Sequence, residues 1–420
     1  MLIQFSAENF LSIKNKCILS LEPSCDKEHL DNLVVEKNNS ALKTIAIYGA
    51  NASGKSNIFK ALTFSILMIR NSNSTQYGMP LPITPFKFDD VSVQKPSSFE
   101  YVFIANDKQK YIYGFSATRE KIYEEYLYCY KTAKPSLIFD RKNCSEYEFT
   151  QALKAKLQPL ADRNIDNKLF LATATSWNAE ATKPAFEWFA RQIETFTSNE
   201  GFEGIALEMY SKDENHELLA FTENLLKQAD INIDSISFKA REVKNNGMLH
   251  PEVQLLVNGM PAPSVHMQYE IQTKHIINNE EESRQFNLSL QEESEGTQRL
   301  FFYAPLISSV IKNGSTLVID EIDKSMHPFI VKHLFGIFNN PEINKSGAQL
   351  IATTHDTSLL SLDFFRRDQI YFVEKDNDTG TTDLYSLDDF SVRKEENIEK
   401  GYLLGRYGAI PYIHAEDLIG

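Results

Sequence analysis

The stretch from Lys43 to Ile66, KTIAIYGANASGKSNIFKALTFSI, constrains the fold of this chain more than any other. It begins with an apolar, β-branched run typical of a buried strand, breaks at Gly49, and resumes after Lys55 with helical periodicity. Residues 49–56 fit the pattern G-x-x-x-x-G-K-[ST], in which a strand, a glycine loop and a helix form a cradle for phosphate groups. A chance match in an ordinary loop is the alternative, but the flanking strand and helix favour the phosphate cradle.

Each fixed position of this pattern has a mechanical reason. Gly49 and Gly54 let the backbone curl so that successive N–H groups and the helix N-terminus face an anion. We expect Lys55 to reach the β- and γ-phosphates of a nucleotide, and Ser56 to offer its hydroxyl oxygen to Mg²⁺. The candidate nucleotide-binding residues of this phosphate loop are Gly49, Asn51, Ala52, Ser53, Gly54, Lys55, Ser56 and Asn57.

The composition is that of an ordinary globular protein. The 420 residues predict about two or three domains' worth of chain. Hydrophobic residues make up 42% and charged residues 24%, which excludes a large disordered or fibrous portion. The net charge of −14 argues against generic nucleic-acid binding, so any contact with DNA or RNA would need a local basic patch.

The spacing of the cysteines indicates whether the chain has a zinc site or disulfides, and the apolar segments indicate where in the cell it is expected. The four cysteines form no C-x-x-C pair and have no suitably spaced histidines, so we expect buried free thiols rather than a zinc site or disulfides. The N-terminal segment lacks the basic and long apolar regions of a signal peptide, and the longest apolar stretch, 61–69, is too short to span a bilayer. We therefore expect a cytoplasmic protein with no membrane partner.

The first two thirds of the chain mix strand and helix patterns. Residues 1–48 alternate in short runs, which predicts paired strands leading into the phosphate-loop strand. Residues 98–130 alternate aromatic and β-branched side chains, which predicts an antiparallel meander whose tyrosines pack in a core rather than stack on bases. Further on we predict helices over 151–162, 183–196 and 213–228, strands over 231–238 and 253–257, and a solvated acidic loop at 280–282.

In the C-terminal third of the chain, the segment Ser315 to Asp323 (STLVIDEID) predicts an apolar strand that ends in acids. A carboxylate strand beside the phosphate-loop strand is what a Mg²⁺-nucleotide site needs, because the metal must also be held from the side opposite Lys55. We expect Asp320 to contact Mg²⁺, directly or through water, and Glu321 to orient and activate the attacking water. A strand that merely ends at an acidic surface turn is the alternative.

Two further motifs flank this acid strand. The run QLIATTHD predicts a buried strand that ends at His355, which could bond to a γ-phosphate and sense hydrolysis, although such a histidine can also be structural. Upstream, Ser294 and Gly296 precede an apolar helix over 300–311 and supply a hydroxyl, a glycine that allows close approach, and a helix N-terminus. These groups can hold an anion together, or Ser294 can be a plain helix N-cap.

The order of these motifs resembles that of ABC-type ATPases, and the DNA-associated branch of SMC, RecF and OLD-like proteins more than the membrane-transport branch. More narrowly, the segments FSAENFLSIKN, YGANASGKSN, LVIDEIDKSMHP, IATTHD and GRYGAIPYI resemble the ABC-like AAA-type ATPases of bacterial abortive-infection and phage-defence systems, such as RloA, AbiL and the ATPase of PARIS systems. The motifs cover about residues 1–60 and 285–413.

The resemblance implies an α/β fold, an ABC-type phosphate-loop core with an antiparallel β subdomain and a mainly helical middle insertion. It implies ATP and Mg²⁺ as cofactors and a homodimer or higher oligomer in which two nucleotides lie between head-to-tail subunits. Ser294 and Gly296 would contact the γ-phosphate held by the second subunit, and Asp323 would lie at the same interface. The chain differs from transporter ATPases in reading SEGTQ in place of a double-glycine signature, and from OLD proteins in showing no TOPRIM nuclease segment.

These inferences predict three parts: an N-terminal ATPase lobe over 1–130, a mixed insertion over 131–285, and a C-terminal lobe over 286–420. The predicted function is that of an ATPase acting as sensor or regulator in an anti-phage system, controlling a separately encoded effector, which could be a TOPRIM or other nuclease. DNA or a phage protein is the expected trigger. The alternatives are a RecF- or SMC-like DNA-repair ATPase, a transporter subunit, and a chain that is itself the toxic effector.

Overall fold

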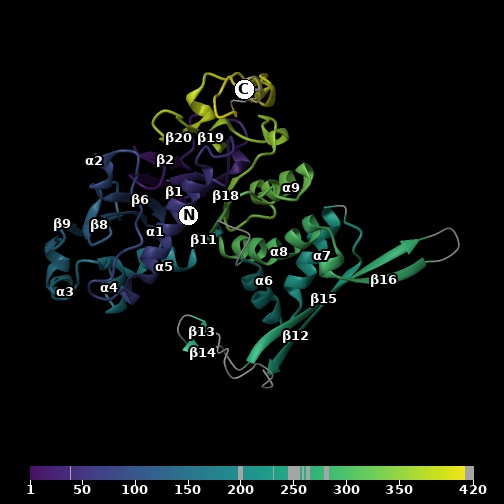
Figure 1. Cartoon of the computed structure of the whole chain (residues 1–420), viewed down its shortest axis with the longest axis horizontal. Helices are drawn as coiled ribbons and strands as arrows, with labels where there is room; N and C mark the ends of the chain where they lie inside the picture. The colour runs from purple at the N-terminus through teal and green to yellow at the C-terminus, as the bar shows by residue number, and fades with distance from the viewer. Residues whose placement is uncertain are drawn as a thin grey trace, which may run out of the picture. The chain divides into compact units, whose positions relative to one another are not determined.

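A computed structural model describes residues 1–37, 39–196, 202–229, 231–244, 256–257, 260–261, 265–278 and 283–411 (Figure 1). The chain divides into two compact units. The first, here called the ATPase unit, comprises Met1–Ser198, Val310–Asp323 and Val331–Gly420. The second, here called the insertion unit, comprises Asn199–Ser309 and Lys324–Ile330. The three-part division expected from the sequence stays a prediction.

A six-stranded sheet carries the motifs of the ATPase unit. Its order is β11-β17-β18-β5-β19-β20, and every neighbouring pair is parallel except β19 with β20. All residues of β5, β17 and β18 are buried, as expected for parallel strands covered on both faces. The strands are β5 Thr44–Gly49, β11 Ile193–Phe196, β17 Thr316–Ile319, β18 Gln349–Thr353, β19 Ile370–Lys375 and β20 Thr382–Ser386.

A seven-stranded antiparallel sheet forms the second layer of the ATPase unit, in the order β10-β9-β8-β7-β6-β1-β2. Strands β6, β7 and β8 follow one another in sequence and in space, so the predicted meander is confirmed. Tyr101, Tyr111 and Tyr113 are buried in the core, as the sequence predicts. The strands are β1 Leu2–Glu8, β2 Cys17–Ser20, β6 Ser97–Ile104, β7 Lys110–Ala117, β8 Ile122–Tyr130, β9 Ser136–Lys142 and β10 Glu146–Glu148.

Helices pack on these sheets around one apolar core, to which α1 contributes Ile58, Phe59, Leu62, Ile66 and Ile69. The α-helices of the ATPase unit are α1 Lys55–Asn71, α2 Asp90–Val93, α3 Gln151–Ala161, α4 Phe170–Ser176, α5 Lys183–Arg191, α9 Pro328–Asn339, which begins in the insertion unit, and α10 Ile398–Leu403. A small hairpin pairs β3 Leu33–Glu36 with β4 Asn39–Leu42. The short 3-10 helices are η1 Leu30–Asn32, η2 Ser72–Ser74, η4 Thr357–Leu359, η5 Arg367–Gln369 and η6 Leu387–Asp389.

Two buried polar side chains fasten these layers together. The Gln349 side-chain amide exchanges hydrogen bonds with the backbone of Leu2, accepting from its N–H at 2.7 Å and donating to its carbonyl at 3.0 Å. It thereby ties β18 of the six-stranded sheet to β1 of the other. Glu125 on β8 accepts the backbone N–H groups of Phe170 at 2.5 Å and Leu171 at 2.8 Å, which are the orphan donors at the start of α4.

The insertion unit combines helices with a three-stranded antiparallel sheet, in which the longest strand, β15, lies between β12 and β16. In Figure 1 these strands form an extended ribbon. Tyr210 on α6 packs against Phe301 of α8 at a ring distance of 4.6 Å. The elements are α6 Phe202–Ser211, α7 Glu217–Gln228, β12 Ser235–Lys244, β13 Leu256–Val257, β14 Met260–Pro261, β15 Val265–Asn278, β16 Ser283–Ser289, η3 Leu290–Glu292 and α8 Glu295–Asn313, which continues into the ATPase unit.

Several sequence expectations need correction. The helix predicted over 183–196 ends at Arg191, and Ile193–Phe196 forms the edge strand β11 because its backbone pairs with the side of β17 that faces away from β18. The helix predicted over 300–311 begins earlier, at Glu295, where the Ser294 hydroxyl accepts the Thr297 N–H. Three cysteines are buried and free as expected, but Cys25 is exposed. The acidic cluster 280–282 and most of the strand predicted at 253–257 lie outside the described residues.

Candidate functional site

The phosphate loop joins β5 to α1 through two glycines that no larger residue could replace. Gly54 lies at the start of α1 with φ +102°, in the left-handed region, and a Cβ there would come 2.2 Å from Thr382 Oγ1. A Cβ on Gly49 would come 2.5 Å from the carbonyl oxygen of Val373. The loop can therefore curl at the carboxyl end of the sheet only because both positions lack a side chain.

Lys55 is the first residue of α1, and its ammonium group lies inside the curl of the loop. It donates to the carbonyl of Gly49 at 2.5 Å and to that of Ala50 at 3.1 Å. Burial lowers the pKa of Lys55 to about 8, and the nearby charges of Asp320, Asp323 and Glu321 act in the opposite direction. The lysine therefore lies within electrostatic reach of all three acids that the sequence predicts for the site.

Hydrogen bonds from outside the motif hold the loop in place. Thr382, the first residue of β20, donates through its hydroxyl to Ser12 Oγ at 2.7 Å and to the Ser53 carbonyl at 3.2 Å. Asn57 on α1 donates to the same Ser12 hydroxyl at 2.7 Å. Ser12 thus connects the N-terminal segment, the phosphate loop and β20 through one oxygen atom.

The acid strand β17 is fixed to the neighbouring strand β18 by the side chain of Thr353. Its hydroxyl donates to Asp320 Oδ1 at 2.7 Å and accepts the backbone N–H of Glu321 at 2.6 Å. Glu321 adopts φ +54°, an uncommon backbone conformation for a residue with a side chain, and its side chain is exposed. The hydroxyl of Thr353 therefore sets the direction in which both acids leave the sheet.

His355 follows β18 and lies next to the acid segment. Its backbone N–H donates to Asp323 Oδ2 at 2.8 Å, while its side chain is exposed. The structure thus brings Lys55, Asp320, Glu321, Asp323 and His355 to one edge of the six-stranded sheet, because their strands β5, β17 and β18 are adjacent and parallel. This edge is the carboxyl end of the strands, where open α/β sheets bind their ligands.

The residues at this edge suit Mg²⁺ bound together with nucleotide phosphates. Ser56 and Asp320 offer a hydroxyl and a carboxylate oxygen, which are the hard ligands this ion prefers. Among the described residues, no group of three or more His, Cys, Asp or Glu side chains could hold a metal by itself. Mg²⁺ bound with a nucleotide keeps several waters and takes other ligands from phosphates, so one hydroxyl and one carboxylate from the protein suffice.

The remaining predicted residues, Ser294 and Gly296, belong to the insertion unit. Ser294 precedes α8, and its hydroxyl accepts the Thr297 backbone N–H at 3.2 Å, as a helix N-cap does. A Cβ on Gly296 would come 2.7 Å from the carbonyl oxygen of Ser325. Ser294 is exposed, so its hydroxyl can still meet a ligand or a second protein surface.

A cleft of about 1160 Å³ opens beside the phosphate loop within the ATPase unit. One wall consists of loop residues 50–53, and the other contains Phe86, Phe88 and the turn between β19 and β20. Phe88 is 72% exposed, and its ring is kept in place by Phe86 at a ring distance of 5.7 Å. A Cβ on Gly380 in the turn would come 2.6 Å from the Phe88 ring, so the turn can lie close to it.

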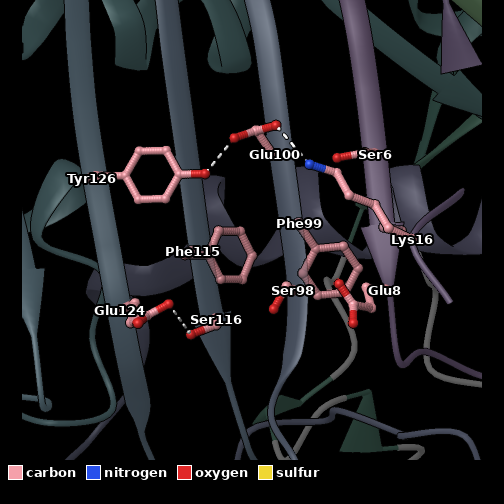
Figure 2. A pocket seen from close by; sticks show the side chains of 11 residues that line it. Ser6, Glu8, Lys16, Ser98, Phe99, Glu100, Phe115, Ser116, Glu124 and Tyr126 are labelled. Carbon is pink, nitrogen blue, oxygen red and sulfur yellow. Dashed lines mark hydrogen bonds and ion pairs between the residues drawn. The ribbon is translucent and has the colours of Figure 1, made fainter. Parts of the chain in front are cut away.

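A smaller cavity of about 130 Å³ lies on the outer face of the antiparallel sheet (Figure 2). Glu100 accepts the Tyr126 hydroxyl at 2.5 Å and pairs with Lys16 at 3.2 Å. The Tyr126 ring reaches Glu100 by crossing Gly114, where a Cβ would come 2.4 Å from the ring. Since these charges satisfy one another, we interpret this cavity as cross-strand packing.

Comparison with known proteins identifies the family. The family model described as "AAA domain, putative AbiEii toxin, Type IV TA system" matches residues 45–361, which is well over half of the chain and includes the phosphate loop, the acid strand and His355. The chain belongs to this family. It is therefore an AAA ATPase, with the α/β phosphate-loop fold expected from the sequence.

Solved structures that match the chain include the SMC head domain from Thermotoga maritima, at 14% identity and TM-score 0.40, covering 92% of this chain and 98% of that one. The Smc head domain derived from Pyrococcus yayanosii matches at 11% identity and TM-score 0.42, covering 97% and 99%. The recombination mediator RecF with ATP matches at 12% identity and TM-score 0.39, covering 91% and 97%. No curated protein matches. Among the described helices, none is both long and apolar enough to cross a bilayer.

Sequence reasoning missed several residues at this site. Thr353 lies in the quoted motif IATTHD, but nothing in the pattern indicates that its hydroxyl joins Asp320 to Glu321. Ser12 and Thr382 lie far apart in sequence and meet only in the folded chain. Phe88 gave no signal because a single aromatic residue in a loop is common.

Proposed function

We propose that this ATPase hydrolyses Mg²⁺-ATP at the carboxyl end of β5, β17 and β18. Lys55 and the backbone of residues 49–57 would hold the phosphates, and Ser56 and Asp320 would hold Mg²⁺. Glu321 would activate water, and His355 would bond to the γ-phosphate. The observation that carries this proposal is that Lys55, Asp320 and Glu321 lie at the same edge of the sheet, where Thr353 joins the two acids.

We propose further that the nucleotide base lies in the cleft beside the phosphate loop. The loop forms one wall of this cleft, so a nucleotide whose phosphates lie in the loop can extend its ribose and base directly into it. The exposed ring of Phe88 provides a flat apolar surface for the base. The volume of about 1160 Å³ is ample for a nucleoside.

The site would be completed by a second copy of the chain. Glu321 and His355 are both exposed, whereas efficient phosphoryl transfer needs a water-excluded environment. Ser294 and Gly296 offer a hydroxyl and a helix N-terminus on the surface of the insertion unit, suited to a γ-phosphate held by another subunit. ATP binding would then close a head-to-tail dimer, or a larger ring, and hydrolysis would reopen it, with Asp323 at the interface.

In the cell, this closure would serve as a sensor that controls a separately encoded effector, such as a TOPRIM or other nuclease, in an anti-phage system. The support is the family description, which names a putative AbiEii toxin and a type IV TA system. The trigger would be DNA or a phage protein. The decisive experiment co-expresses the chain with the product of the neighbouring reading frame during phage infection. Protection that requires both proteins and is lost in Glu321→Gln supports the proposal, whereas protection without ATP hydrolysis contradicts it.

The family description also favours a second candidate function, in which the chain is itself the toxin. Expression of the chain alone separates the two. Growth arrest that depends on Lys55 would favour the toxin, and growth arrest that needs the neighbouring gene would favour the regulator.

A third candidate is a DNA-binding ATPase of RecF or SMC type. Strands β12, β15 and β16 carry the bases Lys239, Arg241, Lys244, Lys274 and Arg284 against the acids Glu242 and Glu270, a local basic excess in an acidic chain. Salt-sensitive binding of DNA by the chain alone, measured by filter binding with and without ATP, would favour this candidate.

A further inference from the structure

Besides Ser53 Oγ in the phosphate loop itself, three buried oxygen atoms near the loop have no hydrogen-bond partner among the described residues. They are the hydroxyl oxygen of Tyr48, Oδ1 of Asp323 and Oδ2 of Asp356. Tyr48 is only 1% exposed. Buried polar atoms of folded proteins are nearly always paired, so three such oxygens within one unit indicate a missing partner.

The three residues lie near the carboxyl ends of three adjacent strands of the six-stranded sheet, β5, β18 and β17. Tyr48 lies in β5 immediately before Gly49, and β5 is paired with β18 on one side. Asp356 follows His355 just beyond β18, and Asp323 is joined to the same turn because its Oδ2 accepts the His355 N–H. The pKa of Tyr48 is raised well above its usual value, first by burial and then by the charges of Asp356 and Asp323.

Neighbouring groups cannot satisfy all three of these oxygens. The other oxygen of Asp356 already accepts the backbone N–H and the hydroxyl of Ser358, at 3.0 and 2.7 Å. The hydroxyl of Tyr402, whose ring lies 6.2 Å from that of Tyr48, donates to the Ala409 carbonyl instead. The phenol has a single proton to donate, so it can satisfy at most one of the two carboxylates.

We propose that Tyr48, Asp323 and Asp356 bind a monovalent cation of the size class of K⁺ or Na⁺. Two carboxylate oxygens and a phenol oxygen form a hard, oxygen-only ligand set. A cation among the three oxygens would offset part of the negative charge of the two carboxylates. A buried carboxylate oxygen left without a partner is costly, and the cation would remove that cost.

A magnesium ion fits this position poorly. Mg²⁺ gives up its waters reluctantly and needs near-ideal octahedral geometry, whereas all three oxygens here are shielded from solvent. The proposed site also differs from the nucleotide-linked Mg²⁺ site, which would use Ser56 and Asp320. The cation would hold the end of β5, the acid segment and the turn at His355 together, so that the phosphate loop and the histidine keep a fixed spacing.

Thermal unfolding of the full chain tests this proposal in the absence of nucleotide and divalent metal. Melting temperatures are compared in KCl, NaCl and choline chloride at equal ionic strength, because choline is too large for a buried site. We expect a saturable rise of the melting temperature with KCl or NaCl that choline does not reproduce. Tyr48→Phe should raise the half-saturating salt concentration about tenfold, through loss of one ligand oxygen.

The matched control is Tyr407→Phe, because the Tyr407 hydroxyl is also buried without a partner but belongs to a different part of the aromatic cluster. It should keep the wild-type cation response. Crystals of the wild-type protein soaked in thallium(I) should show anomalous density between Tyr48, Asp323 and Asp356. Equal melting temperatures in all three salts, an unchanged half-saturating concentration in Tyr48→Phe, or thallium density elsewhere would each overturn the proposal. Since no step involves ATP, these outcomes are independent of the proposed nucleotide chemistry.

Discussion

At the scale of single residues, Lys55 makes nucleotide binding depend on pH. Its pKa of about 8 lies below the usual lysine value because of burial, and bound phosphates would raise it again. ATP binding should therefore take up protons near pH 8, and ATP affinity should fall as the pH rises above that value. Calorimetric titrations in two buffers of different ionisation enthalpy measure this uptake. No uptake between about pH 7 and pH 9 would contradict the assignment of Lys55.

The Lys55→Ala variant should no longer bind ATP.

Substitutions of Glu321 and Thr353 should distinguish the residue that activates the attacking water from the residue that only positions the two acids. We expect Glu321→Gln to bind ATP but to lower its hydrolysis at least ~100-fold, because the attacking water loses its base.

Thr353→Val should lower kcat about tenfold or more with little change in ATP affinity, because the hydroxyl only orients the two acids. Thr353→Ser keeps the hydroxyl and should restore most of the rate. Steady-state phosphate release and equilibrium ATP binding give both readouts.

A substitution of Phe88 tests where the adenine base of ATP lies. Phe88→Ala should weaken ATP binding about tenfold, because base–aromatic stacking contributes about 1–3 kcal/mol. Binding of inorganic triphosphate, which has no base, should not change, and this comparison is the internal control. A loss of affinity equal for both ligands would place the base outside the cleft.

At the scale of elements, the attachment of α4 to β8 should carry much of the stability of the antiparallel layer. Glu125→Ala leaves the N–H groups of Phe170 and Leu171 without an acceptor in a buried setting. We expect the free energy of unfolding to fall by about 3 kcal/mol or more. The neighbouring Glu124→Ala, on the exposed side of the same strand, should change it by about 0.5 kcal/mol or less. Urea unfolding of both variants measures the difference.

The elements also show how far sequence reasoning reaches. The phosphate-loop strand and helix, the meander and strands β17 and β18 follow from local periodicity, so the pattern predicts them. Strand β11 does not, because Ile193–Phe196 continues a helical pattern and becomes a strand only by pairing with β17. The same limit applies to the site: Thr353, Ser12 and Thr382 act through contacts between distant segments, and no local pattern encodes these.

At the scale of the whole molecule, the predicted site is divided between two units of the chain. The phosphate loop, the acids and His355 belong to the ATPase unit, whereas Ser294 and Gly296 belong to the insertion unit. If Ser294 acts on the nucleotide of a second subunit, ATP should drive association whenever hydrolysis is blocked. We therefore expect Glu321→Gln to elute at the mass of a dimer or larger oligomer with ATP, and at a lower mass with ADP. Size-exclusion chromatography with light scattering measures this.

The contribution of Ser294 is tested in the same Glu321→Gln background. Adding Ser294→Arg should block ATP-driven association without weakening ATP binding to the single chain, because the bulky side chain obstructs only the surface that meets the other subunit. Ser211→Arg is a matched control, since Ser211 is also an exposed serine of the insertion unit, at the end of α6. It should associate normally. Association of the Ser294→Arg variant to the same mass would mean that the insertion unit takes no part in closing the site, and that the ATP-bound oligomer forms through other surfaces.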